Sequence, residues 1–200
     1  MAAGFPFIEV ERKFLVRADT WRERVSGTEL IRQSYLTAAP GITTRVRQIG
    51  DRTVLTYKTA RIGISRGEIE IPITAEVAAW LFAVCPFPAI EKQRHLVTHG
   101  EATWEIDVFL GRHQGLVVAE IEMAHPFQPV DLPDWIGKEV THDAKFKNSR
   151  LYRATPSELK AVTPRIYRSA ALSAAKSNFS ETAPDGPLSR SRESVARSAG

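Results

Sequence analysis

The feature that most constrains this chain is a strand-like segment near its start in which charged residues alternate with apolar ones. Successive side chains of a β-strand point to opposite faces. In the stretch from residue 8 to 16, Glu9, Glu11 and Lys13 therefore share one face, and Ile8 and Val10 share the other. A single solvated sheet face could carry these charges at little cost. What argues against that explanation is that the pattern recurs along the chain.

Pairs of charged residues that flank one other residue return in five later segments. They are Arg45 and Arg47, Glu68 and Glu70, Lys92 and Arg94, Glu105 and Asp107, and Glu120 and Glu122. Like charges on one sheet face repel one another. We therefore expect the acidic and basic strand faces to converge on a ligand that carries both positive and negative charge. Metal ions bound to a polyphosphate fit this description.

Eight short segments rich in Ile, Val, Thr and aromatic residues are predicted to be strands, because turn residues separate them. Gly50-Asp51 is expected to form a tight hairpin. A helix is predicted from an N-cap at Thr74 to Pro86, a short helical turn over 131–137, and a last helix over 143–153. The predicted strands are 6–16, 31–37, 42–49, 52–59, 65–73, 88–98, 103–110 and 116–125.

Composition divides the chain into one domain and a tail. Of 27 Lys and Arg and 23 Asp and Glu, residues 151–200 hold 8 and 4, so residues 1–150 hold 19 of each and are balanced. Without a basic stripe, nucleic-acid binding is not expected. We predict a folded domain over 1–154 and a disordered Ser-, Ala- and Arg-rich tail over 155–200.

Cysteine content and hydropathy predict the compartment. The longest apolar run, 77–85, is too short to span a membrane, and the N-terminus lacks the pattern of a signal peptide. A single cysteine, Cys85, excludes an internal disulfide. We therefore expect a cytoplasmic protein that does not bind membranes and is a monomer or a homodimer.

Many antiparallel strands with little helix predict a mainly β fold, either a sandwich or a barrel. A sandwich would bury one apolar face of each sheet and disperse the charge outward. A closed barrel of about eight strands has an interior that can hold one small ligand. The charged faces favour an eight-stranded antiparallel closed β-barrel with charges inside, and a few helices and loops are then expected to cover the outer apolar face, including Ile8, Ile71, Ile106 and Ile121.

Seven charged blocks in a fixed order resemble the CYTH domain of the triphosphate tunnel metalloenzymes. The blocks begin with Glu-x-Glu-x-Lys at residue 9, continue through Arg-x-Arg, Lys58, Glu-x-Glu, Glu-Lys-x-Arg and Trp-Glu-Ile-Asp, and end with Glu-x-Glu at residue 120. The similarity extends from Phe7 to Tyr152, and it is greatest to small bacterial members that hydrolyse inorganic triphosphate.

The resemblance implies a role for each charged position. Lys13, Arg45, Arg47, Lys58 and Arg94 match the phosphate-binding positions, where arginine pairs with two phosphate oxygens and lysine gives a point charge. Carboxylates suit Mg²⁺ or Mn²⁺, and two ions are expected with the substrate bound. The matching acidic positions are Glu9, Glu11, Glu68, Glu70, Asp107, Glu120 and Glu122.

The resemblance also implies catalytic residues. Lys92 and Tyr35 match a Lys–Tyr dyad that serves as the base, while Glu9 and Glu11, with Asp107, match the side that positions a metal ion and the attacking water. As alternatives, Tyr35 is a packing residue and Lys92 binds phosphate. The rival functions are class IV adenylate cyclase, thiamine triphosphatase and a polyphosphate-binding module without turnover.

Overall fold

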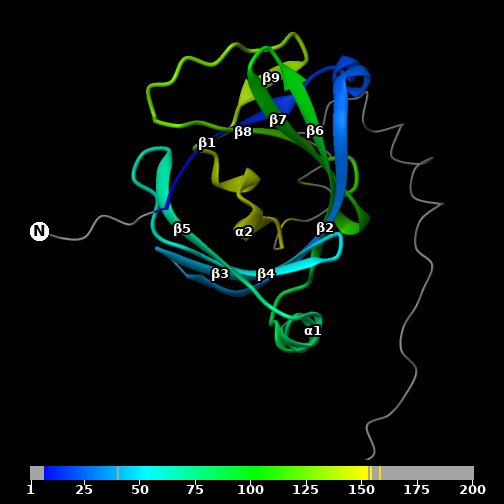
Figure 1. Cartoon of the computed structure of the whole chain (residues 1–200), viewed down its shortest axis with the longest axis vertical. Coiled ribbons are helices and arrows are strands. Elements are labelled where there is room, and N and C mark those ends of the chain that lie inside the picture. Colours follow the sequence, from blue (N-terminus) through cyan, green and yellow to red (C-terminus); the bar gives the residue numbers. More distant parts are fainter. Residues whose placement is uncertain (1–6, 40, 153, 155–157, 159–200) are drawn as a thin grey trace, which may run out of the picture.

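Eight antiparallel strands close into a barrel in the computed structural model, which describes residues 7–39, 41–152, 154 and 158. Figure 1 looks into this ring of strands. The order around the barrel is β1, β5, β4, β3, β2, β6, β7, β8 and back to β1. The bounds are β1 Ile8–Val16, β2 Val25–Ala39, β3 Ile42–Ile49, β4 Arg52–Lys58, β5 Ser65–Pro72, β6 Ile90–His99, β7 Ala102–Phe109 and β8 Val117–Glu122.

The first strand closes the barrel because its two halves have different partners. Residues 8–10 of β1 pair with β5, with Glu9 opposite Arg66, and residues 11–15 pair with β8, with Lys13 opposite Glu120. A ninth strand, β9 (Ile136–Glu139), pairs with the end of β1 outside the ring. The Gly50-Asp51 hairpin between β3 and β4 is confirmed, and Gly50 takes the positive φ of 53° that favours glycine in such turns.

The helices are few and short. They are the 3-10 helices η1 (Thr20–Arg24), η2 (Gly111–His113) and η3 (Ala144–Phe146) and the α-helices α1 (Ala75–Val84) and α2 (Asn148–Leu151). The α1 helix lies outside the ring, beside β3 and β4, whereas α2 lies over its centre (Figure 1). No helix in the described part is both long and apolar enough to cross a membrane.

Two apolar clusters hold this architecture together. One lies outside the barrel, where the outer faces of β1, β7 and β8 pack against η1, β9 and their neighbours, including Trp21 and Trp135. The other seals one end of the barrel, where Tyr35, Ile90 and Phe109 pack beneath η3 and α2. The charged residues occupy the part of the interior that the second cluster leaves open.

The outer face is covered less completely than the sequence predicts. Ile106 and Ile121 are buried, as expected, but Ile8 and Ile71 are 56% and 50% exposed. The covering elements lie over β1, β7 and β8, and α1 is the helix on the opposite side of the ring (Figure 1). The α1 helix buries Ala78 and leaves Val77, Trp80 and Val84 largely exposed.

Several predicted elements are corrected. The second strand begins at residue 25 rather than 31. The helical turn predicted over 131–137 is a turn that leads into β9 at Ile136. The predicted helix over 143–153 is two short helices, η3 and α2, with the Asp143 carboxylate accepting a hydrogen bond from the Lys145 amide (3.0 Å). The predicted tail, 155–200, lies outside the described residues except for residue 158.

Candidate active site

The inner faces of the strands line two cavities that share residues. The larger, of about 730 Å³, is bordered by side chains of both signs from all eight strands of the barrel. The smaller, of about 170 Å³, lies between the β4–β5 turn and α2. The residues common to both are Glu11, Lys13, Arg45, Lys58, Arg66 and Asn148.

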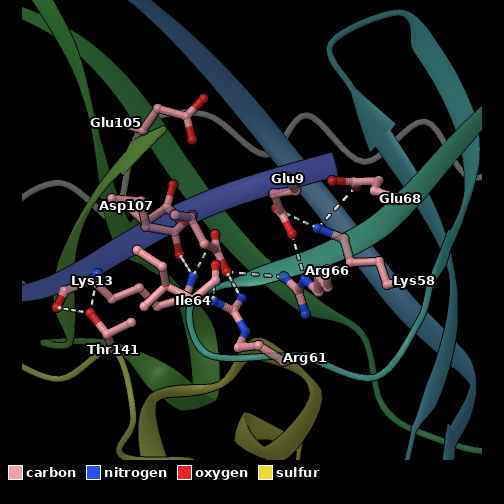
Figure 2. A network of polar contacts seen from close by, with 12 residues as sticks. Glu9, Lys13, Lys58, Arg61, Ile64, Arg66, Glu68, Glu105, Asp107 and Thr141 are labelled. Carbon is pink, nitrogen blue, oxygen red and sulfur yellow. Dashed lines mark hydrogen bonds and ion pairs between the residues drawn. The ribbon is translucent and has the colours of Figure 1, made fainter. Parts of the chain in front are cut away.

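Glu9 and Glu11 are each paired with more than one cation, and Figure 2 shows Glu9 beside Lys58 and Arg66. Glu9 accepts hydrogen bonds from Lys58 Nζ (2.7 Å) and from the Arg66 guanidinium. Glu11 is paired with Lys13 (3.3 Å), Arg66 (3.0 Å) and Arg61. Burial by itself would raise the pKa of Glu9, but Lys58 and then Arg66 outweigh it and hold that pKa far below its usual range. Both carboxylates are therefore ionised at neutral pH.

A second group of charges surrounds the guanidinium of Arg94. It donates to both oxygens of Asp107 (2.7 and 2.8 Å) and to Glu120 (2.9 Å), and its remaining nitrogen pairs with Glu105. Three carboxylates thus use all three nitrogens of Arg94, the residue that the resemblance assigns to phosphate. Asp107 is fully buried and also pairs with Lys92, and neither of these two lines a cavity.

Arg45 and Arg47 differ from Arg94 because their guanidinium groups are poorly paired. Both side chains are buried, and in the described part of the chain the Nε atom of each has no hydrogen-bond partner. Their ion pairs are long, with Arg45 at 3.7 Å from Glu68 and Arg47 at 3.5 Å from Glu70. A buried cationic donor without a partner is costly unless a ligand supplies one.

The remaining acids at the larger cavity have oxygen atoms that a hard metal ion prefers. Burial, and then Glu9 and Glu68, raises the pKa of Glu122, which makes no ion pair within the described residues. Carboxylates that raise one another's pKa would be stabilised by a bound cation, so this donor set fits a divalent metal. As the side chains stand in the described part, no three acidic, His or Cys residues are grouped as a ready metal site.

In the described part of the chain no hydrogen bond joins Lys92 to Tyr35. Lys92 pairs with Asp107, whereas Tyr35 lines the smaller cavity and accepts a long hydrogen bond from Gln33 (3.4 Å). Burial raises the pKa of Tyr35, and burial, followed by the nearby Arg94, lowers the pKa of Lys92.

Among the charged residues that line the cavities but were given no role from the sequence are Arg61, Arg66 and Glu105. Arg66 lies on the same strand face as Glu68 and Glu70, and Glu105 lies on the same face as Asp107. The two-residue period of a strand could therefore have identified both. Arg61 lies in the turn after β4, where no periodic pattern indicates the direction of a side chain. Apart from Lys92 and Asp107, the predicted site residues all line one of the two cavities or both.

Comparison with known proteins agrees with this geometry. The family model of the CYTH domain matches residues 8–154. The chain belongs to the CYTH family. Among its relatives, an inorganic triphosphatase of Acetivibrio thermocellus is 41% identical over 147 residues, which cover 72% of this chain and 93% of that protein. An inorganic triphosphatase of Nitrosomonas europaea is 35% identical over 156 residues, covering 74% and 99%.

The fold of this CYTH protein is also found in a solved structure. The crystal structure of an inorganic triphosphatase superposes with a TM-score of 0.54 at 32% identity, covering 74% of this chain and 99% of that chain. The matched region is the barrel with its sealing helices, and the residues beyond it fall outside the family match.

Proposed function

We propose that this protein hydrolyses inorganic triphosphate to pyrophosphate and phosphate in a reaction that depends on a divalent metal. The observation that carries the proposal is the pair Arg45 and Arg47, two buried guanidinium groups beside the larger cavity whose Nε atoms lack partners in the described part. Planar guanidinium groups match the oxygens of a phosphoryl group. The relatives described as inorganic triphosphatases support the same substrate.

The charge of the substrate suits the interior. A triphosphate carries about four to five negative charges at neutral pH, given terminal phosphate pKa values near 6. Lys13, Arg45, Arg47 and Lys58 line the larger cavity and are proposed to bind its oxygens. We propose that Arg94 binds phosphate only after its carboxylate partners have moved to the metal ions. Fixed cations of this kind hold the scissile group in position and stabilise the charge that develops on it.

The proposed metal is Mg²⁺ or Mn²⁺, because triphosphatases with this domain depend on metal and carboxylates suit these ions. We propose that two ions are present when the substrate is bound. A bound ion would neutralise phosphate oxygens and lower the pKa of a water molecule. In the proposed mechanism Glu9 and Glu11 also orient that water. The proposed ligands are Glu9, Glu11, Glu68, Glu70, Asp107, Glu120 and Glu122, of which all except the deeply buried Asp107 line the larger cavity.

The roles of Lys92 and Tyr35 in proton transfer remain predictions from the resemblance. In this proposal Tyr35 would act from the smaller cavity, which it lines, and Lys92 from its pair with Asp107. Lys92→Met and Tyr35→Phe test this directly. Removal of the general base should lower kcat, whereas removal of a residue that only binds phosphate should raise KM.

A panel of substrates tests the proposed function. Phosphate release from tripolyphosphate, ATP and thiamine triphosphate is measured with Mg²⁺, with Mn²⁺ and with a chelator. Tripolyphosphate should be the preferred substrate, and chelation should abolish turnover. Cyclic AMP as product would indicate a cyclase, preference for thiamine triphosphate would indicate that rival enzyme, and tight binding without release of phosphate would indicate a binding module.

Arg45→Gln and Arg47→Gln connect the panel to the structure. Each should raise KM for tripolyphosphate by about tenfold or more, as expected for the loss of a charged hydrogen bond. Arg112→Gln, an exposed change in η2 that borders neither cavity, is the control. If all three variants behave alike, the assignment of the two buried arginines is wrong.

A further inference from the structure

We propose that Arg61 is a displaceable counter-ion, which pairs with Glu11 while no metal is bound and moves to substrate phosphate in the smaller cavity when a metal takes Glu11. The inference rests on the proposed function, because it concerns the same metal and the same substrate. Neither Arg61 nor the turn that carries it belongs to the charged blocks of the strands.

The position of Arg61 suits a side chain that changes partner. It lies in the turn between β4 and β5, which is closed by hydrogen bonds between Ile62 and Ser65 (2.8 and 3.1 Å) and bends at Gly63, with φ of +63°. One guanidinium nitrogen donates to Ile64 O (3.1 Å) and another pairs with Glu11. Because Arg61 lies between β4 and β5 and belongs to neither strand, its backbone can shift together with its side chain without breaking sheet hydrogen bonds.

The two cavities differ in charge, and Glu11 lies at their boundary. Acids and bases are mixed around the larger cavity. Around the smaller one, Glu11 is the one acidic residue among the described lining residues. The basic residues there are Lys13, Arg45, Lys58, Arg61, Arg66, Lys147 and Arg150. The smaller cavity therefore fits a phosphate group without its own metal ion.

Competition for Glu11 follows from these contacts. Glu11 is buried and already has Lys13, Arg61 and Arg66 as cationic partners. Arg61 and Arg66 both donate to the same oxygen, Glu11 Oε1. A divalent ion that binds this oxygen would be repelled by both guanidinium groups. Metal binding is thus expected to expel an arginine, and Arg61 on its turn is freer to move than Arg66, which is paired within β5 opposite Glu9.

The experiment measures metal binding without substrate and turnover with it. Mn²⁺ is titrated into the whole protein by calorimetry, with free Mn²⁺ checked by electron paramagnetic resonance. Removal of the competing charge in Arg61→Gln should tighten Mn²⁺ binding by about tenfold. At saturating Mn²⁺ the same variant should raise KM for tripolyphosphate by about tenfold, while kcat changes less.

Two variants control the measurement. Arg61→Lys keeps the positive charge and should bind Mn²⁺ as the wild type does, and Arg112→Gln removes an exposed arginine that borders neither cavity. Melting temperatures establish that each variant is folded. Equal Mn²⁺ affinity in wild type and Arg61→Gln, or weaker binding by a folded Arg61→Gln, would overturn the displacement. If the wild type binds no Mn²⁺, the metal-dependent function itself fails, and the displacement with it.

Discussion

Replacing Glu105 with glutamine should change stability in a way that depends on pH. Burial, the largest influence, raises the pKa of Glu105 to about 7 from its ordinary value of 4.5; Arg94 opposes this, while Glu120 and Asp107 add to it. Lys92 is the remaining charge that acts on Glu105. The folded state therefore holds this proton more tightly than the unfolded chain does.

The sign and size of the effect follow from this difference. Because the folded-state pKa is raised, the stabilisation is complete below pH 4.5 and is lost as the pH rises through 7. The gap between 4.5 and about 7 corresponds to roughly 3 kcal/mol. About 2.5 kcal/mol of it falls between pH 5 and 8.5. Glutamine resembles the neutral acid, so Glu105→Gln should gain about that much relative to wild type over this range.

Urea unfolding at pH 5 and pH 8.5 in the presence of a chelator measures the effect. Fluorescence reports it, because Trp21, Trp104 and Trp135 are fully buried. Glu101→Gln, an exposed change in the turn of the same hairpin, is the control and should show no such gain. A difference in unfolding free energy between Glu105→Gln and wild type that is the same at both pH values would refute the reasoning.

Four further outcomes are expected. Glu122→Gln should reduce turnover by about a hundredfold, since metal-ligand losses are of this size; near-normal turnover would remove it from the metal site. Tripolyphosphate should exceed ATP by at least about tenfold in kcat/KM, and equal values would contradict a site that reads phosphate alone. A chain ending at Thr155 should keep its activity and melting temperature, and a fall of several degrees would reveal a missed structural element. Asp107→Asn should cost about 3 kcal/mol in urea unfolding, because Lys92 and Arg94 lose a buried partner; a cost below about 1 kcal/mol would contradict this.

The barrel and its charged interior could be predicted because strand period determines the direction of each side chain. Glu9, Glu11 and Lys13 point inward together for this reason. The start of α1 was likewise predictable, since the Thr74 hydroxyl accepts a hydrogen bond from the Val77 amide (3.3 Å). Both results depend on local rules that the neighbouring strands do not alter.

Features that depend on how the strands pair and pack could not be predicted. The saturation of Arg94 arises from acids on β7 and β8, and it is the register of these two strands against β6 that brings the acids to Arg94. Helical spacing in α1 indicated an apolar face but not that Trp80 would be 64% exposed, because that depends on which strands lie beneath. The direction of Arg61 is set by the bend at Gly63 rather than by any period.

Within the ring, β1 and β5 are joined by the fewest residue pairs, and a proposed metal ligand lies at this junction. In the described part of the chain, three residue pairs join β1 to β5: Ile8–Gly67, Glu9–Arg66 and Val10–Ser65. One of these pairs is itself the ion pair of a proposed metal ligand. A metal ion that draws Glu9 away from Arg66 would therefore remove one ion pair between β1 and β5 and replace it with contacts through the metal. Metal binding and the stability of this junction would then be thermodynamically linked, so the unfolding free energy of the barrel should depend on the concentration of the metal ion.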